Sequence, residues 1–491
     1  MEILYTALAT ICVLLLGVLL DGRMKYWRYR LPPGPTGWPI LGCLPSLTEN
    51  LHLDMVKLGQ EYGSVFSVYF GTRLSIVLNG IDAVREAYVN KGLVFAGRPD
   101  EPHIIELNPE RSGMLYMTYS EAWRGEKKAI VRALKAFDYG SASLESKILL
   151  QIDMMKEEIN LGLGKRQDIC KLASFTMSNT MSSILFGTEY KYNDEEFNNF
   201  LKNSAIFVYH HARLMGDLNY LPFQRFLPKT IKRIAQCRKP YDKMMEFFLK
   251  HINHHKATKQ DNICRDFTDV IIEEAIKQNS ALPDWNDEKF CYTLDSLFVD
   301  AVDTSPVQFH WLLLYVHYFD NVADRIHNEI EEVIGERQPA LKDKDRMPYT
   351  EAVIFETFRV SSVVPLATTH CAMEDTKLFG YDIPEGVDVF ANLWNVHHDP
   401  DVWGDPDVFR PERFIKDGKC VRHEALIPFS MGRRACIGEQ LAKKQIFLLL
   451  TSLLQQYKFH LDDKPTSLKG EFSIALVPPP FTLRVEQRLV E

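Results

Sequence analysis

Apolar residues recur every three to four positions along most of this chain, which is the period of a helix that buries one face. This pattern predicts helices over 145–160, 171–187, 240–256, 266–278, 287–317, 320–334, 349–360 and 437–456. β-Branched and aromatic residues on either side of Gly71 and Thr72 predict a β-hairpin over 64–80. Shorter strand-like segments occur at 378–390 and near the C-terminus. The expected fold class is therefore mainly α, with small antiparallel β-sheets.

An uncharged run of 18 residues, from Ile3 to Leu20, opens the chain. This length is about the minimum for one membrane-spanning helix. A cleaved signal peptide is the alternative, but Glu2 stands where basic residues would be expected and no A-x-A cleavage site follows. Basic residues between 23 and 30 follow directly, and this charge placement puts the downstream chain in the cytoplasm. We therefore expect residues 1–21 to be a single membrane anchor.

The segment 22–42 is first basic and then rich in proline. Pro32, Pro33 and Pro35 disfavour a helix and give a stiff, extended segment. The remaining chain contains neither a second linker nor a repeat of solenoid length. We expect a hinge over 22–42 and one folded body over 43–491.

The net charge and the cysteine content limit the binding partners and the cellular compartment that we expect for this protein. A net charge of −8 argues against a general nucleic-acid binder and leaves small molecules or proteins. The nine cysteines are odd in number and lack paired spacing, so they make a poor disulfide framework. The cysteine content therefore favours a reducing compartment that faces the cytosol.

One cysteine lies in a setting with its own chemistry. In "PFSMGRRACIGEQ", Cys436 precedes an amphipathic segment, so it lies at a helix N-terminus that favours a thiolate, the form that ligates metals. Gly432 and Gly438 leave room for a flat group, Arg434 offers a fork to a carboxylate, and Phe429 is placed to shield the sulfur. These features fit a haem iron with its propionates. Zinc is disfavoured because no second ligand lies at zinc-site spacing. The alternative is a small buried hydrophobic residue.

The same residues fill all five fixed positions of F-x-x-G-x-R-x-C-x-G, and the run resembles the haem-binding signature of the cytochromes P450. An anchor followed by a proline-rich hinge resembles the microsomal members, and "YTEAVIFETFRV" with "VPLATTH" resembles the animal family-2-type enzymes. The resemblance implies the cytochrome P450 fold, with haem b between the long central helix and the cysteine-loop helix. It also implies that Cys436 ligates the iron and that Phe429, Arg434 and Gly438 lie beside the cofactor.

The stretch "ETFR" places Glu356 and Arg359 on one helix face. Because the flanking residues are apolar, we expect the pair to be buried and to need further partners. The resemblance supplies one in "FRPERF", where Arg413 matches the family's position. The implied role of the three residues is structural, behind the haem.

In "LFVDAVDTSPVQFHW", within the long predicted helix, Asp303 and Thr304 match the second half of the family pattern [AG]-G-x-[DE]-T-[TS]. The resemblance implies that they relay protons to bound dioxygen. The first half departs from the pattern, since Asp300 replaces the small residue, Ala301 replaces glycine, and Pro306 follows inside the helix. Asp300 has three interpretations: a substrate-facing charge, a partner of a basic residue, or a sign of altered oxygen chemistry.

The resemblance also assigns side chains to the haem propionates. Arg98 comes from "FAGRP", Trp123 from "EAWRGEKK" and His370 from "PLATTH", in addition to Arg434. Lys127 stands where the family usually has arginine, and it keeps the charge but loses the bidentate geometry. The implied substrate pocket is apolar and favours a fatty acid, steroid or xenobiotic. Its residues would be Leu115, Phe207, Phe298, Ala301, Val364 and Leu476.

The implied activity is that of a monooxygenase, which inserts one atom of O2 into a lipophilic substrate. Electrons would come from NADPH through cytochrome P450 reductase, with cytochrome b5 as an optional second donor and Lys127, Lys128, Lys443 and Lys444 as a basic docking face. The resemblance implies an endoplasmic reticulum membrane protein whose catalytic domain, 43–491, faces the cytosol.

Two other classes of function stay open. One is an isomerase or dehydratase of lipid hydroperoxides that needs no reductase, which Asp300, Ala301 and Pro306 favour. The other is a haem-based ligand binder without catalysis.

Overall fold

The structure is a computed structural model that describes residues 2–136, 142–260, 263–277, 282, 285–472 and 474–488. Its helices are α1 (Glu2–Met24), α2 (Leu51–Tyr62), α3 (Ile81–Arg85), α4 (Pro102–Leu107), α5 (Glu121–Ala136), α6 (Ala142–Asn160), α7 (Ile169–Phe186), α8 (Glu195–Asn219), α9 (Pro228–Thr258), α10 (Phe267–Ile276), α11 (Asp287–Tyr318), α12 (Val322–Val333), α13 (Pro348–Ser361), α14 (Leu393–His397), α15 (Pro400–Trp403) and α16 (Glu439–Gln456). Shorter turns of helix are η1 (Leu44–Ser46), η2 (Glu86–Asn90), η3 (Pro222–Phe226), η4 (Leu341–Arg346), η5 (Pro411–Phe414) and η6 (Gly432–Arg434). Its strands are β1 (Val65–Phe70), β2 (Arg73–Leu78), β3 (Arg166–Gln167), β4 (His370–Cys371), β5 (Thr376–Leu378), β6 (Tyr381–Ile383), β7 (Asp388–Ala391), β8 (Ile415–Lys416), β9 (Lys419–Cys420), β10 (Tyr457–His460), β11 (Glu471–Phe472), β12 (Leu476–Val477) and β13 (Leu483–Gln487).

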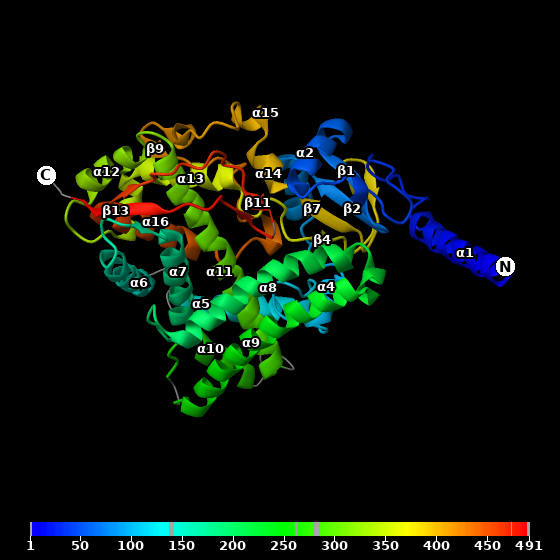
Figure 1. Cartoon of the computed structure of the whole chain (residues 1–491), viewed down its shortest axis with the longest axis horizontal. Coiled ribbons are helices and arrows are strands. Elements are labelled where there is room, and N and C mark those ends of the chain that lie inside the picture. Colours follow the sequence, from blue (N-terminus) through cyan, green and yellow to red (C-terminus); the bar gives the residue numbers. More distant parts are fainter. Residues whose placement is uncertain are drawn as a thin grey trace.

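The mainly helical fold with small sheets is confirmed, and so is the hairpin, in which Val65 of β1 lies opposite Leu78 of β2. The largest sheet has the order β1-β2-β7-β4 and lies at the end of the molecule nearest α1 (Figure 1). One pairing differs from the expected antiparallel sheets, because β2 and β7 run parallel, with Ser75 opposite Asp388. A parallel pair needs a long crossover connection, and local alternation along a strand carries no information about so distant a partner.

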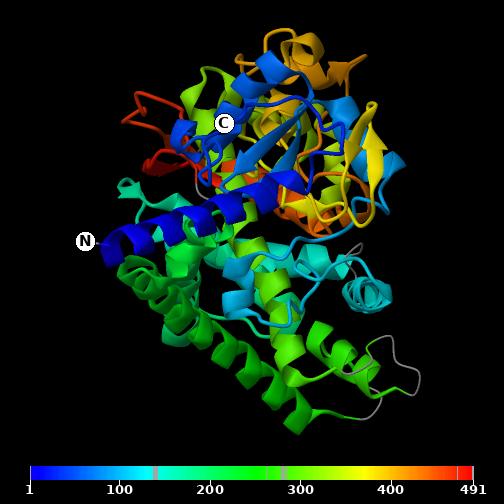
Figure 2. The same ribbon diagram turned by 90° about the vertical axis from the view of Figure 1, so that its right-hand side faces the viewer.

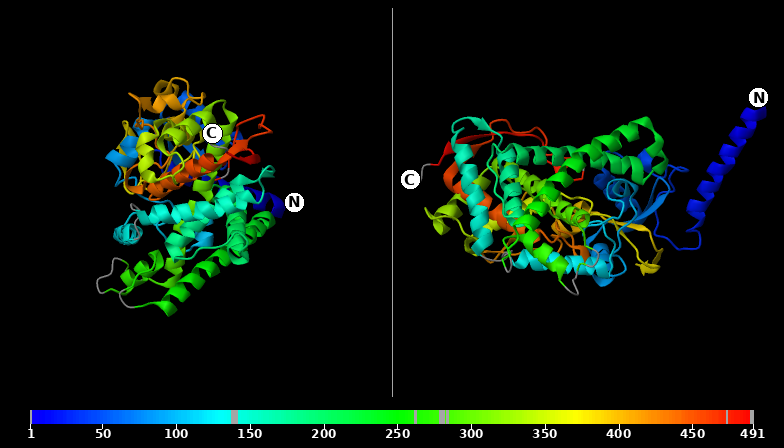
Figure 3. Two further views of the ribbon diagram at one scale, coloured as in Figure 1. Left: turned by 90° about the vertical axis from the view of Figure 1, so that its left-hand side faces the viewer. Right: turned by 90° about the horizontal axis from the view of Figure 1, so that it is seen from below.

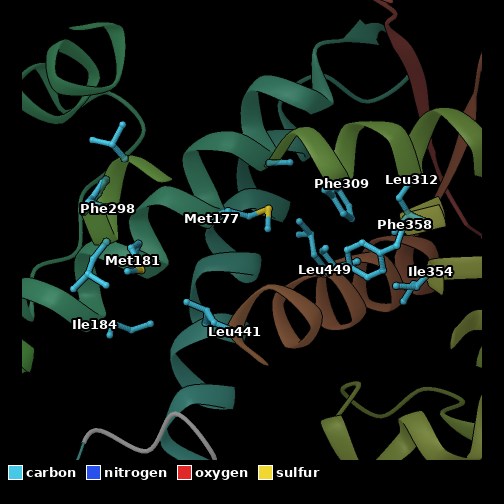
Figure 4. Close-up of a cluster of buried hydrophobic side chains, with 14 of the residues drawn as sticks. Met177, Met181, Ile184, Phe298, Phe309, Leu312, Ile354, Phe358, Leu441 and Leu449 are labelled. Carbon is cyan, nitrogen blue, oxygen red and sulfur yellow. The ribbon is translucent and has the colours of Figure 1, made fainter. Parts of the chain in front are cut away.

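Helix α11 runs through the middle of the molecule and packs on α7, α9, α13 and α16. It begins where the Asn286 side chain accepts a hydrogen bond from the Lys289 N–H at 2.8 Å, as an N-cap residue does. In Figure 4, Met177 of α7, Phe309 of α11 and Leu449 of α16 lie in one buried cluster. The predicted helix over 287–317 is therefore the central element of the core.

The long helices α8 and α9 pack on each other and lie on one side of the molecule (Figures 1 and 2). Helix α9 begins at Pro228, which is earlier than the predicted start at 240, and it continues through Pro240. Proline is most common at the first position of a helix, whereas Pro240 lies inside α9. Helices α5 and α8 have no counterpart in the predicted set.

Helix α1 protrudes from the rest of the molecule (Figures 1 and 3). Among the described residues, no helix is both long and apolar enough to cross a membrane. Part of the predicted anchor, namely residue 1 and the side chains at positions 3, 14, 15 and 17–21, lies outside the described residues, as do the side chains at positions 22–24 of the predicted hinge.

The proline-rich part of the predicted hinge packs against the sheet. The Ser67 N–H of β1 donates to the Pro33 carbonyl at 2.8 Å, and the Cys43 N–H donates to the Tyr69 carbonyl at 2.7 Å. Gly42 forms a bridge with Phe70. This segment is thus attached to the folded body along the edge of β1.

Candidate functional site

Cys436 lies in the turn between η6 and α16. Its backbone N–H donates to the Phe429 carbonyl at 3.0 Å, which closes the loop around the sulfur. Burial raises the pKa of the Cys436 thiol to about 11, while the backbone N–H groups of Gly438 and Glu439 act in the opposite direction. The side chain still has exposed surface. A thiol with N–H donors on one side and accessible surface on the other is suited to ligate a metal.

The two glycines of the motif have different roles. Gly432 has a φ of 82°, and a Cβ built on it would lie 1.9 Å from the Tyr88 carbonyl oxygen. The expectation that Gly432 leaves room for a flat group is wrong, because the backbone of η2 fills that space. Gly438 caps α16. Phe429 is half-buried, with its ring 5.3 Å from the ring of Phe358.

Two arginines lie near Cys436 without an acidic partner. Arg98 is buried, and the guanidinium of Arg434 lies 4.2 Å from the centre of the Trp123 ring. Burial, with the charge of Arg98, lowers the pKa of Arg434 to about 9. Neither arginine forms an ion pair with a carboxylate of the described residues. Their donors reach only backbone carbonyls, which are Leu115 (2.9 Å), Thr368 (3.3 Å) and Thr369 (2.7 Å) for Arg98, and Ala96 (3.0 Å), Met114 (3.1 Å) and Met117 (2.6 Å) for Arg434.

The other predicted propionate ligands lie around these arginines. Trp123 donates to the Met114 carbonyl at 3.0 Å. Nδ1 of His370 is 2.6 Å from the Phe95 carbonyl oxygen. Lys127 donates to the Arg433 carbonyl at 2.7 Å and lies 5.0 Å from the centre of the Trp123 ring.

This set of donors provides a test of whether haem fits. A buried cation (Arg98) and a half-buried one (Arg434) that both lack a carboxylate are costly unless an anion joins them. A group with two carboxylates would pair with the two arginines, and a metal in the same group would accept the Cys436 thiolate. The chemistry of Cys436, Arg98 and Arg434 therefore fits haem.

On α11, the side chains of Asp303 and Thr304 are not joined to each other. Thr304 Oγ1 donates to the Asp300 carbonyl at 2.7 Å, and Ser204 of α8 donates to Asp303 at 3.5 Å. Burial raises the pKa of Asp303 to about 7, against the effect of the Ser204 hydrogen bond. A carboxyl with this pKa is able to give or take a proton near neutral pH.

Asp300 has an exposed side chain although it lies in the middle of a mostly buried helix. Burial of its surroundings and the charge of Asp303 raise its pKa to about 7, whereas Arg98 lowers it. The charge of Asp300 also raises the pKa of Cys436. Asp300 therefore lies on the side of α11 that faces Cys436 and Arg98.

Glu356 of α13 lies at the centre of a fully hydrogen-bonded group of buried charges. Arg359 donates to its carboxylate through two nitrogens, each at 2.8 Å, and Arg413 donates to it at 3.0 Å. Arg359 also reaches the carbonyls of His397 (2.9 Å) and Pro406 (2.8 Å). The structure thus brings these three residues together.

The residues expected to line a substrate pocket fall into two groups. Leu115, Ala301 and Val364 keep partly exposed side chains, whereas Phe207, Phe298 and Leu476 are buried. The Phe298 ring packs 5.0 Å from Phe200. The Leu476 carbonyl accepts a hydrogen bond from the Trp311 indole at 2.7 Å.

Sequence reasoning did not single out two further residues near the predicted ones. Tyr88 packs its backbone against Gly432, and its ring stacks 4.0 Å from His370. Asp295 is buried on α11, next to Tyr241. An acid inside the apolar run "TLDSLFVD" was the available signal for Asp295, whereas nothing in the sequence marks Tyr88.

Comparison with known proteins agrees with this geometry. Residues 32–485 match the family described as Cytochrome P450. The chain is 34% identical to cytochrome P450 2U1 of Bos taurus, over 94% of this chain and 91% of the relative. It is 32% identical to cytochrome P450 2J1 of Oryctolagus cuniculus (91% and 89% covered) and 32% identical to cytochrome P450 2D3 of Rattus norvegicus (97% of each). The chain belongs to the cytochrome P450 family of enzymes.

Proposed function

We propose that this protein is a haem-thiolate monooxygenase that inserts one oxygen atom from O2 into a lipophilic substrate. Family membership implies a haem-thiolate cofactor, and we take it to be haem b. The observation that carries the proposal is Cys436, held by N–H donors at the start of α16 near buried Arg98 and half-buried Arg434, which lack carboxylate partners among the described residues. This arrangement supports a ligand for iron together with a site for two propionates.

The bound haem supplies the one-electron and O2 chemistry. In our proposal Cys436 ligates its iron, with Phe429 and Gly438 shaping the loop around the sulfur. Arg98, Trp123, Lys127, His370 and Arg434 hold the propionates.

Proton delivery is assigned to Asp303 and Thr304. Asp303 exchanges protons readily near neutral pH because burial raises its pKa to about 7. Thr304 carries a hydroxyl proton at Oγ1, which the Asp300 carbonyl orients. Substrate would enter beside these residues, along the side chains of Leu115, Phe207, Phe298, Ala301, Val364 and Leu476.

We also propose a location and partners. Residues 1–21 would anchor the chain in the endoplasmic reticulum membrane, 22–42 would form the hinge, and 43–491 would be the catalytic domain facing the cytosol. Exposed Phe223, Phe226 and Leu227, on and beside η3, would add apolar contact with the bilayer surface. Electrons would come from NADPH through cytochrome P450 reductase, with cytochrome b5 as an optional second donor.

A second function keeps the haem but needs no reductase, namely isomerisation or dehydration of lipid hydroperoxides. Asp300 favours it, because an acid at this position of α11 departs from the family pattern and lies toward Cys436. Product formation from a hydroperoxide without NADPH and reductase would establish this alternative. A strict requirement for both would exclude it.

The test of the haem-thiolate site is Cys436→Ala, with Cys420→Ala as the matched control. Cys420 is a half-buried free cysteine of β9, so its loss removes a thiol from another element of the chain. We expect Cys436→Ala to lose the thiolate type of haem spectrum and Cys420→Ala to keep it. A thiolate spectrum that survives in Cys436→Ala would refute the proposal.

A further inference from the structure

Two buried histidines lie side by side where α4 meets α8, and most of their ring nitrogens have no partner. The ring of His103 in α4 lies 4.7 Å from the ring of His211 in α8, and the two helices are neighbours in Figure 1. The two residues are only 2% and 7% exposed. Among the described residues, no group forms a hydrogen bond with either ring nitrogen of His211 or with Nε2 of His103. Polar groups of buried side chains normally have such partners, so these rings are suited to a polar group from outside the chain.

The hydrogen bonds of Asn219 fix which ring nitrogen of His103 carries a proton. Oδ1 of Asn219 accepts from the His103 backbone N–H at 3.3 Å, and an amide nitrogen could not accept at that position. Nδ1 of His103 lies 2.7 Å from the same oxygen, so Nδ1 donates its proton to it. The second nitrogen of a neutral imidazole then carries no proton. Nε2 of His103 is therefore a hydrogen-bond acceptor.

Both rings are neutral near pH 7. Burial lowers the pKa of His103 to about 4, and the charge of Arg73 acts in the same direction, against the hydrogen bond to Asn219. Burial, together with the charge of His103, also lowers the pKa of His211. No carboxylate of the described residues forms an ion pair with either ring. Neutral His211 offers one N–H donor and one acceptor nitrogen, so the pair presents one donor and two acceptors.

Helix α8 connects this histidine pair with the residue assigned to proton delivery. Ser204, Phe207 and His211 are three and four positions apart, which places them on one face of α8. Ser204 donates to Asp303 of α11 at 3.5 Å. Because seven residues of helix span about 10 Å, His211 lies about 10 Å farther along α8 than the contact with Asp303.

The side chains around the pair are apolar or aromatic. Phe207 stacks 4.9 Å from His211 and 4.9 Å from Tyr241 of α9. Leu107 and Leu214, one turn farther along α4 and α8, are buried. An apolar lining with a few polar groups is typical of small-molecule sites, in which the polar groups fix the orientation of the ligand.

We propose that His103 and His211 bind the hydroxyl group of the substrate, so that the substrate class is a lipophilic alcohol. This inference rests on the proposed function, because it names the substrate class of the same enzyme. The O–H of the alcohol donates to one acceptor nitrogen, and its oxygen accepts from the N–H of His211. The apolar body extends from the pair past Phe207 toward Asp303. A carboxylate cannot donate, and the acceptor nitrogen of His103 would face its negative charge.

The test is equilibrium dialysis of the full-length holoenzyme at pH 7.5 with three probes that share one body. They are 8-phenyloctan-1-ol, 1-fluoro-8-phenyloctane and the anion 8-phenyloctanoate. Their methylene chain spans about 10 Å when extended, since three chain bonds span up to about 3.6 Å. Fluorine is close to a hydroxyl in size but does not donate a hydrogen bond. We expect the alcohol to bind at least tenfold more tightly than the more apolar fluoride, and the anion most weakly.

Variants assign that preference to residues. His211→Phe keeps a ring next to Phe207 and removes both nitrogens, so it should reduce the affinity for the alcohol about tenfold and leave that for the fluoride within twofold. The control is His210→Phe, which removes a half-buried imidazole from the adjacent residue of α8, and it should change neither affinity. If His211→Phe does not fold, His103→Phe takes its place with the same expectation.

Equal affinity for the alcohol and the fluoride, or tighter binding of the anion, would overturn the inference in the unmodified protein. So would an alcohol preference that survives in the substituted variant, as it would if the hydroxyl bound the iron instead of the histidines. Failure of the proposed function is seen separately, as the absence of a thiolate haem spectrum in the parent chain. A holoenzyme with a normal spectrum and no alcohol preference would refute the hydroxyl site alone.

Discussion

At the scale of single residues, Glu356 shows how hydrogen bonds stabilise a buried charge in this core. Arg359 and Arg413 both reach its carboxylate, and the backbone N–H of Arg410 adds a hydrogen bond at 2.8 Å. Spacing along a helix predicts the Glu356–Arg359 pair. It does not predict the backbone carbonyls that complete the group, because those come from His397 and from the chain around Pro406.

Arg413→Met should destabilise the protein by about 3–5 kcal/mol, because it leaves a buried carboxylate with one partner fewer. The control is Arg410→Met, which lies three residues earlier and whose side chain pairs with Asp405 at 2.7 Å while 47% exposed. Exposed pairs contribute roughly 0–1 kcal/mol. Urea unfolding of the two holoenzyme variants measures the difference. Equal losses would mean that Arg413 acts only as a surface charge.

Thr304→Ala should uncouple NADPH consumption from product formation, because it removes the hydroxyl assigned to proton delivery. The measurement is the ratio of product formed to NADPH consumed in the reconstituted system. Ser305→Ala is the control, since it removes a hydroxyl from the adjacent residue of the same helix. An unchanged ratio in Thr304→Ala would remove this residue from the relay.

At the scale of elements, helices were predicted well where periodicity and caps agreed. Gly187 ends α7 with a φ of 60°, as a left-handed C-cap does. Contacts between elements were not predictable from local pattern. The hydrogen bond from Thr293 of α11 to Glu126 of α5, at 2.9 Å, joins residues 167 positions apart.

This contact between α5 and α11 gives a pH prediction. Burial raises the pKa of Glu126 to about 7, against hydrogen bonds from Thr293 and the Met114 backbone. In the folded state Glu126 therefore binds its proton more tightly than in the unfolded state. The stability that this proton confers is complete below about pH 4 and is lost as the pH rises toward 7, by roughly 2–3 kcal/mol.

Glu126→Gln should abolish that loss, since an amide does not titrate. Compared with the parent, the variant should gain stability between pH 5 and pH 8, as measured by urea unfolding at both values. Glu121→Gln, on the exposed face at the start of α5, is the control and should follow the parent curve. If Glu126→Gln also follows the parent, the carboxyl is ionised throughout that range.

At the scale of the whole molecule, the site is assembled from segments far apart in the sequence. Arg434 donates to the Ala96 carbonyl, 338 positions away, and Arg98 donates to the Thr369 carbonyl, 271 positions away. Periodicity predicts none of these contacts, so Arg98, Trp123, Lys127 and His370 were expected only through the resemblance to a family, whereas Arg434 was marked by its place in the cysteine motif. Asp300 departs from that family's pattern, so the resemblance did not predict which residues surround its side chain.

The contacts of the N-terminal segment with the rest of the molecule indicate which of its residues can be deleted. Helix α1 protrudes (Figure 3), whereas the chain after it is tied to the body. The Arg30 N–H donates to the Asp382 carboxylate at 2.8 Å, and the Tyr29 hydroxyl donates to Asp375 at 2.9 Å. The Pro33 carbonyl then accepts the hydrogen bond from Ser67 in β1. Tolerance to truncation follows from such backbone contacts.

Deletion of residues 2–24 should therefore leave the thiolate haem spectrum and the unfolding midpoint nearly unchanged, while most of the protein moves from the membrane pellet to the supernatant on sedimentation. Deletion of residues 2–42 should also lower the stability, because the edge of β1 then loses its partners. If the shorter deletion leaves the protein in the pellet, residues 1–21 are not its main attachment, and the exposed aromatic residues near η3 become the next segment to test. If both deletions are equally stable, the proline-rich segment is a free spacer that contributes nothing to the sheet.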